Sequence, residues 1–153
     1  MERVVESVSR RGTCELGVDA TGVGRPVVDH LRISGKGVRM RGVVVTGGGS
    51  GRTENGYDHV PKRDLIAGLQ VLFEFGELRI PRTLTLLDEL KKEMAEMEVR
   101  MTKAGNESWG TWREGQHDDM VFALALACWA AGKENPGSLS GVDGRWVGGR
   151  VWR

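Results

Sequence analysis

The sequence predicts an α/β fold, and three consecutive segments carry that prediction. Residues Glu15–Asp19 form a short apolar run that ends in a carboxylate, which is typical of a buried strand. Arg25–Ile33 has helical spacing, with Pro26 in the first turn, where its missing amide hydrogen does no harm. Val38–Thr46 is a second strand-like run. A strand, a helix and a strand in this order predict a right-handed parallel crossover in one sheet.

The remaining elements follow from hydrophobic periodicity and turn residues. Further helices are predicted at Glu2–Arg11, Lys62–Phe75, Leu84–Met97 and from His117 or Asp118 to about Ala131. Leu78–Ile80 is predicted as a short strand, and Val99–Lys103 is expected to pair with Glu107–Trp112 in a hairpin. Gly47–Asp58, rich in glycine and polar residues, is predicted as a loop that could contact DNA.

The length of 153 residues fits a single domain, which we expect to span residues 1–131. Gly, Pro and Ser dominate residues 132–153, which predicts a flexible tail. The longest apolar run, Met120–Ala131, is too short to cross a bilayer, and no apolar leader follows Met1. We therefore expect a cytoplasmic protein without a membrane partner.

The charge balance excludes a globally basic protein, because the formal net charge is only +1. Binding to DNA would need a local basic face. The candidates for such a face, each of which can equally be an ordinary solvated residue, are Arg10, Arg11, Arg25, Arg39, Arg41, Lys62 and Arg63. Two distant cysteines, Cys14 and Cys128, make neither a disulfide framework nor a zinc site, and both are predicted as small buried hydrophobes.

Five tryptophans could stack nucleic-acid bases, but packing in the core or tail is the simpler prediction for most of them. Neither glycine-rich segment predicts a nucleotide site. Val45–Thr53 lacks the G-x-x-x-x-G-K-[ST] spacing, and Gly22-Val23-Gly24 lacks the third glycine of a dinucleotide fingerprint.

The candidate chemical site consists of Asp19, Asp118 and Asp119. Asp19 ends a predicted parallel strand, where open α/β sheets place their ligands, and the Asp118-Asp119 pair opens a helix. Converging carboxylates make a hard-oxygen site for Mg²⁺ or Mn²⁺. Two such cations can activate a water and stabilise the leaving oxygen of a phosphodiester.

Each acid also has a simpler interpretation. Asp19 can bond the amides of its own turn, Asp118 can be a plain N-cap, and Asp119 can favour the positive end of the helix dipole. Only the joint arrangement of the three acids indicates a metal site.

Three blocks together resemble the C-terminal half of the large terminase subunits of tailed phages and prophages. They are VDATGVGRPVVDHLR at Val18–Arg32, HVPKRDLIAGLQVLFEFGELRI at His59–Ile80 and WREGQHDDMVFALALACW at Trp112–Trp129. The resemblance covers most of Cys14 to Ala131.

The resemblance implies an RNase H-like fold, in which a central mixed sheet is flanked by helices. It implies a nuclease that cuts concatemeric double-stranded DNA during packaging with a divalent metal, held here by Asp19, Asp118 and Asp119. It also implies the terminase small subunit and the portal protein as partners of the full-length protein.

The sequence departs from that family in two ways. It is expected to lack the N-terminal three-stranded meander that carries the first catalytic aspartate, and Glu2, Glu6 and Glu15 are not placed to replace that residue. It also has no Walker A motif. The chain alone is therefore expected to bind metal weakly and to cut DNA poorly or not at all. An incomplete domain that only binds DNA or protein stays open as the alternative, and the three blocks argue against a transposase or junction resolvase.

Overall fold

The computed structural model describes residues 15–33, 38–101, 107–110 and 118–134. The chain divides into two compact units, Met1–Pro61 and Lys62–Arg153, and each is described by itself. The predicted helix at Glu2–Arg11 and most of the predicted tail lie outside the described residues.

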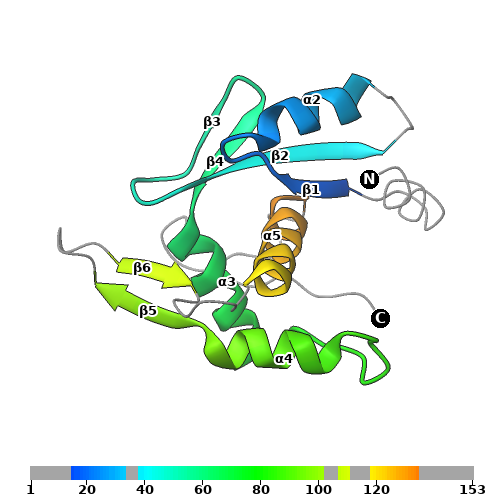
Figure 1. Cartoon of the computed structure of the whole chain (residues 1–153), viewed down its shortest axis with the longest axis vertical. Coiled ribbons are helices and arrows are strands. Elements are labelled where there is room, and N and C mark those ends of the chain that lie inside the picture. The colour runs from blue at the N-terminus through cyan, green and yellow to red at the C-terminus, as the bar shows by residue number, and fades with distance from the viewer. Residues whose placement is uncertain (1–14, 34–37, 102–106, 111–117, 135–153) are drawn as a thin grey trace. The chain divides into compact units, whose positions relative to one another are not determined.

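The first unit is a four-stranded mixed sheet with one helix (Figure 1). Its elements are β1 (Glu15–Asp19), α2 (Gly24–Ile33), β2 (Arg39–Thr46), β3 (Arg52–Glu54) and β4 (Tyr57–Pro61). The strand order is β1-β2-β4-β3; β1, β2 and β4 run parallel, and β3 is antiparallel to β4. The predicted α/β fold and the parallel pairing of the first two strands are confirmed.

The hairpin β3–β4 corrects the prediction of a loop over Gly47–Asp58. Asn55 and Gly56 both have positive φ, of 52° and 77°, as the favoured two-residue hairpin turn requires. The residues of β3 are all exposed, so their polar composition resembles that of a loop. The Asn-Gly pair was the available indication of a hairpin.

The core of the first unit lies between α2 and one face of the sheet. Ala20, Val28 and Tyr57 are buried there, and Val18 and Val44 pack against them. The Tyr57 ring lies close against β2 at residue 42, which is a glycine. A Cβ on Gly42 would lie 2.7 Å from the Tyr57 ring and 3.2 Å from Val28 Cγ1.

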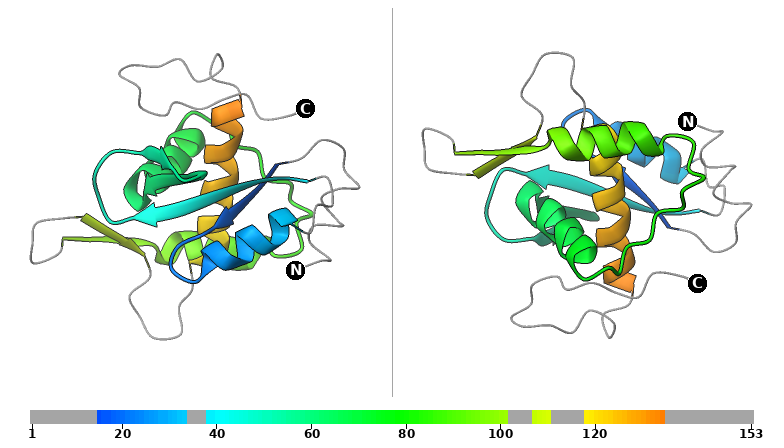
Figure 2. Two further views of the ribbon diagram at one scale, coloured as in Figure 1. Left: turned by 90° about the horizontal axis from the view of Figure 1, so that it is seen from above. Right: turned by 90° about the horizontal axis from the view of Figure 1, so that it is seen from below.

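The second unit consists of three helices and a small hairpin. These are α3 (Lys62–Glu74), α4 (Leu87–Glu96), β5 (Glu98–Met101), β6 (Glu107–Gly110) and α5 (Asp119–Glu134). Helix α5 contacts both α3 and α4 (Figure 2). The antiparallel pairing of β5 with β6 confirms the predicted hairpin. None of the helices among the described residues is long and apolar enough to cross a membrane.

Helix α3 ends at Glu74, one residue before the predicted end, and it is followed by Phe75 and by Gly76, which has a φ of +64°. The amides of Gly76 and Glu77 donate to the carbonyl oxygens of Phe73 and Leu72, so the last turn is closed by a glycine C-cap. The predicted strand at Leu78–Ile80 is wrong. The Leu78 amide donates back to the Leu72 carbonyl, and residues 78–80 belong to no strand.

Two helix boundaries differ from the prediction by three residues. Helix α4 begins at Leu87 rather than Leu84, because turn bonds join Leu84 to Pro81 and Leu87 to Leu84. Helix α5 continues three residues beyond Ala131, to Glu134. In this last turn the Lys133 ammonium lies 5.5 Å from the centre of the Trp129 ring, a cation–π contact that favours its continuation.

We predict that Gly42→Ala destabilises the protein by about 1–3 kcal/mol, because the new methyl group overpacks the contact with Tyr57 and Val28. Gly47→Ala is the matched control, since a Cβ there meets nothing within 4 Å and the change should stay within about 0.5 kcal/mol. Urea unfolding measures both. Equal stabilities for the two variants would contradict the proposed packing.

Candidate functional site

Asp19 is held at the carboxyl end of β1 by a turn that is bonded to β2. The Ala20 amide donates to the Val43 carbonyl at 2.7 Å, and the Val45 amide donates to Thr21 Oγ1 at 2.9 Å. A Cβ on Gly24 would lie 2.4 Å from the Asp19 carbonyl oxygen, so only glycine allows α2 to begin this close to the strand.

The Asp19 side chain is exposed, and its Oδ1 accepts a hydrogen bond from the Thr21 amide at 2.8 Å. The Asx-turn interpretation considered for this residue is therefore confirmed. That bond also orients the carboxylate at the strand end, where the metal-site prediction needs it.

A charge cluster that the sequence analysis missed crosses three strands of the same sheet. Arg41 on β2 donates to Glu15 Oε2 on β1 and to Asp58 Oδ2 on β4, both at 3.0 Å, and Thr53 donates to Asp58 Oδ1 at 2.6 Å. The side chain of Arg41 is 21% exposed and those of Glu15 and Asp58 are 14% exposed. The hydrogen bond to Glu15, with that to Asp58, raises the pKa of Arg41 above its ordinary value.

The other described members of the predicted basic set also have local partners. Arg25 lies 5.3 Å from the centre of the Tyr57 ring. Arg39 lies 3.7 Å from Glu15, Lys62 lies 2.8 Å from Asp118 and Arg63 lies 3.3 Å from Asp64. A basic DNA-binding face therefore stays a prediction, and Arg10 and Arg11 lie outside the described residues.

Tyr57 anchors α2 to the sheet. Its hydroxyl donates to the Asp29 carboxylate, and the Arg32 guanidinium lies 4.8 Å from the ring centre while donating to the Gly56 carbonyl at 2.9 Å. The bond to Asp29 raises the pKa of Tyr57.

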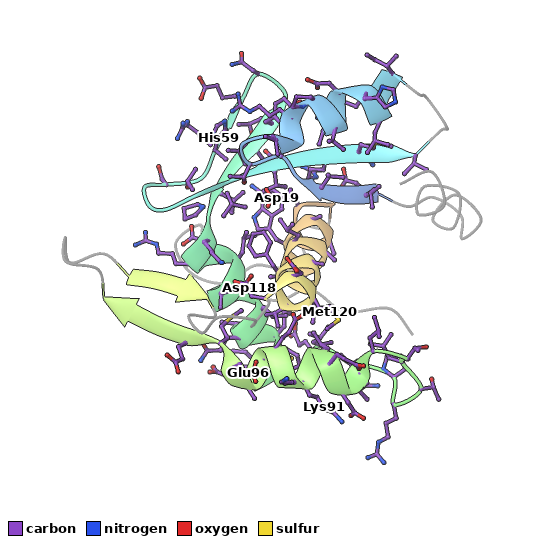
Figure 3. All side chains as sticks on the ribbon, viewed as in Figure 1. Asp19, His59, Lys91, Glu96, Asp118 and Met120 are labelled. Carbon is purple, nitrogen blue, oxygen red and sulfur yellow. The ribbon has the colours of Figure 1, made fainter. Side chains whose placement is uncertain are left out.

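In the second unit, Asp118 is the N-cap residue of α5, since its carbonyl accepts the Phe122 amide at 2.8 Å. The next two orphan amides, those of Met120 and Val121, donate to Glu93 Oε2 of α4 at 2.8 and 3.1 Å. Figure 3 labels Asp118 and Met120 at the start of this helix.

The carboxylate of Asp118 has a different partner. Its Oδ2 accepts a hydrogen bond from Lys62 Nζ at 2.8 Å, and the same ammonium lies 5.3 Å from the centre of the Phe122 ring. The side chains of Lys62 and Asp118 are 31% and 27% exposed. The plain N-cap interpretation of Asp118 therefore does not describe its side chain, because Glu93 accepts from the amides that an N-cap would bind.

Asp119 is exposed in the first turn of α5, next to Asp118. These two acids belong to the second unit and Asp19 to the first, so the convergence of all three stays a prediction. Among residues 15–33, 38–101, 107–110 and 118–134, no group of three His, Cys, Asp or Glu side chains is arranged to hold a metal ion.

Comparison with known proteins identifies the family. A model of the terminase RNaseH-like domain matches residues 1–130. The chain belongs to this family. Large terminase subunits of Thermus phage G20c and Thermus virus P23-45 are each 38% identical to it over 66 residues, which are 43% of this chain and 13% of each relative. The matched region is thus a small part of those proteins. No solved structure matches the chain.

Because the chain belongs to this family, its mixed sheet is part of an RNase H-like fold, as predicted. The terminase domain offers hard oxygen donors at Asp19, Asp118 and Asp119, and this donor chemistry fits Mg²⁺ or Mn²⁺. Asp118 already has a cationic neighbour in Lys62, which a metal ion bound by Asp118 would have to displace.

The structure describes only one of the two cysteines that were predicted to be buried. Cys14 lies outside the described residues, and Cys128 on α5 is half-buried. Trp129 is buried as predicted, whereas no side chain of the other four tryptophans is described.

We predict that Arg41→Met destabilises the terminase domain by about 2–3 kcal/mol, because two mostly buried carboxylates lose their shared cation. Arg52→Met is the control. It breaks a pair with Glu54 in which both side chains are more than half exposed, and should cost under about 0.5 kcal/mol. Thermal unfolding at neutral pH measures the difference, and equal losses would refute a special role for Arg41.

Burial raises the pKa of the Cys128 thiol from 9.0 to about 11. Its thiolate at pH 8 should therefore be about a hundredfold scarcer than that of an unfolded thiol. The neutral thiol stabilises the fold fully below pH 9, and that contribution is lost as the pH rises toward about 11. Iodoacetamide labelling of a Cys14→Ser variant across this range tests the prediction, which a labelling midpoint at pH 9 would exclude.

Proposed function

We propose that this chain is the metal-dependent endonuclease domain of a phage terminase large subunit, which cleaves concatemeric viral DNA during genome packaging. The family match over residues 1–130 carries the proposal. Double-stranded DNA is the proposed substrate. In the full-length protein, the small terminase subunit and the portal protein are the proposed partners.

Asp19, Asp118 and Asp119 are the proposed ligands of Mg²⁺ or Mn²⁺. When bound, a pair of such cations activates a water and stabilises the leaving oxygen of a phosphodiester. Asp19 is already oriented by the Thr21 amide, which leaves its second oxygen as the natural donor. Asp118 is oriented by the Lys62 ammonium, which balances its negative charge.

Lys62 has a proposed second role in this scheme. It is the first residue of α3, and it contacts Asp118 through its ammonium group. If Asp118 held a divalent cation, its carboxylate would bind the metal in place of that ammonium. A displaced ammonium beside the site is suited to a phosphate oxygen, since lysine binds phosphate as a point charge.

The second candidate function is a binding module without catalysis. One observation favours it: the Asp118 carboxylate is already paired with the Lys62 ammonium, so its charge is balanced without a metal ion. Such a module would bind DNA or a packaging protein equally well in EDTA, whereas the nuclease needs the metal.

The nuclease proposal predicts Mn²⁺-dependent nicking of supercoiled plasmid. The chain is used in excess over plasmid, because weak activity is expected of it alone. Asp19→Ala and Asp118→Ala should each lower the nicking rate by about a hundredfold or more, because loss of a mere hydrogen-bond partner of a metal ligand already costs about 10- to 100-fold.

Asp88→Ala is the control, since Asp88 is a carboxylate on α4 with a 92% exposed side chain and should leave nicking unchanged. Nicking that survives both Asp19→Ala and Asp118→Ala would refute the assigned ligands. DNA binding in EDTA, with no cleavage in Mn²⁺ or Mg²⁺, would favour the binding module instead.

A further inference from the structure

The first backbone amides of α5, like those of every helix, need hydrogen-bond acceptors from outside the regular helical pattern. The first amides of a helix have no partner within it, and the N-cap side chain ordinarily accepts from the second or third of them. In α5 the N-cap is Asp118, and those amides belong to Met120 and Val121. The carboxylate of an aspartate at this position would normally accept hydrogen bonds from these amides.

Glu93 accepts from both amides instead. Its Oε2 lies 2.8 Å from the Met120 nitrogen and 3.1 Å from the Val121 nitrogen, although α4 is 27 and 28 residues away in the chain. One carboxylate oxygen thus satisfies two donors at the positive end of the helix dipole, where a negative charge is stabilising.

Glu93 can reach these amides because of its place on α4. It lies three residues after Leu90, which is buried, so both side chains point from the same face of the helix. Helix α4 contacts α5, and Glu93 is itself only half-exposed. A glutamate on a packed face needs a partner, and the orphan amides of α5 supply it.

Capping by Glu93 changes which group the Asp118 carboxylate binds. With the amides occupied, its carboxylate turns to the Lys62 ammonium at 2.8 Å rather than to its own helix. The acid that the metal-site proposal needs is therefore held next to a cation.

We propose that Glu93 is a positioning residue for Asp118: it caps α5 from the neighbouring helix, so that the Asp118 carboxylate faces the Lys62 ammonium instead of the amides of its own helix, and a bound divalent cation would have only that ammonium to displace. The purpose of this arrangement rests on the proposed function, whereas the capping itself does not. Glu93 acts here as a hydrogen-bond acceptor and not as a metal ligand.

The first test is a stability cycle without metal or DNA. Without Glu93, Asp118 should swing back and cap its own helix. Glu93→Ala alone should therefore cost little, and the double variant Glu93→Ala/Asp118→Ala should lower Tm by more than the sum of the two single losses. The excess should correspond to about a fivefold change in the unfolding equilibrium constant, the usual effect of an N-cap.

Additive losses would overturn the proposal, because they would show that the two carboxylates do not substitute for each other. Glu89→Ala is the control for removing an acid from α4, since Glu89 is exposed and lies one turn earlier. It should show no excess loss with Asp118→Ala. If the double variant does not fold, Glu93→Ala/Asp118→Gly replaces it, because glycine is a milder loss at an N-cap. A loss greater than the sum of the two single losses is again expected, and additive losses would again overturn the proposal.

The second test measures Mn²⁺ affinity by calorimetry in the same variants. Glu93→Ala should weaken binding about fivefold, because the metal must then compete with the amides for Asp118, and Glu93→Gln should restore most of the affinity. Equal weakening by both changes would make Glu93 a ligand and overturn its positioning role. If the unmodified chain binds no Mn²⁺, the proposed function fails, and the stability cycle still decides the capping.

Discussion

Orphan amides at the start of a helix must find acceptors, and in this terminase domain the choice of acceptor decides what Asp118 can do. The amides of Met120 and Val121 donate to Glu93 of the neighbouring helix. These donors are therefore not left unpaired, which would be unfavourable for part-buried groups. Asp118 is then held by Lys62. The packing of α4 on α5 is thereby linked to the chemistry proposed for the first residues of α5.

In the first unit, too, some charged side chains pair with one another while a candidate acid lies apart from them. Glu15, Arg41 and Asp58 neutralise one another across three strands, so these charges stabilise the sheet and are not available to a substrate. Asp19 lies outside that cluster, in the exposed turn after β1. Gly24 lets α2 begin directly against that strand end, which shortens the turn and fixes the position of the acid.

The elements predicted correctly are those in which local pattern and pairing agree. The interior of β1 and the second half of β2 are apolar, and α3 has a regular apolar stripe, with a glycine shortly after the helix. The predictions were wrong where strand formation depends on pairing with a second strand that is not evident from the local pattern. The polar segment Arg52–Glu54 is a strand because β4 pairs with it, whereas the apolar Leu78–Ile80 is none because it has no strand partner.

Residue pattern alone determined the α/β class, most of the helices, the resemblance to the terminase family and the three candidate acids. Only the tertiary structure decided how two of those acids are bonded, and it revealed Glu93 and Lys62 at the start of α5 and the Arg41 cluster in the sheet. The reason is physical. Local periodicity reports contacts within a few residues, whereas Lys62 meets Asp118 across 56 residues and Glu93 meets α5 across 27. Those contacts exist only once the helices pack.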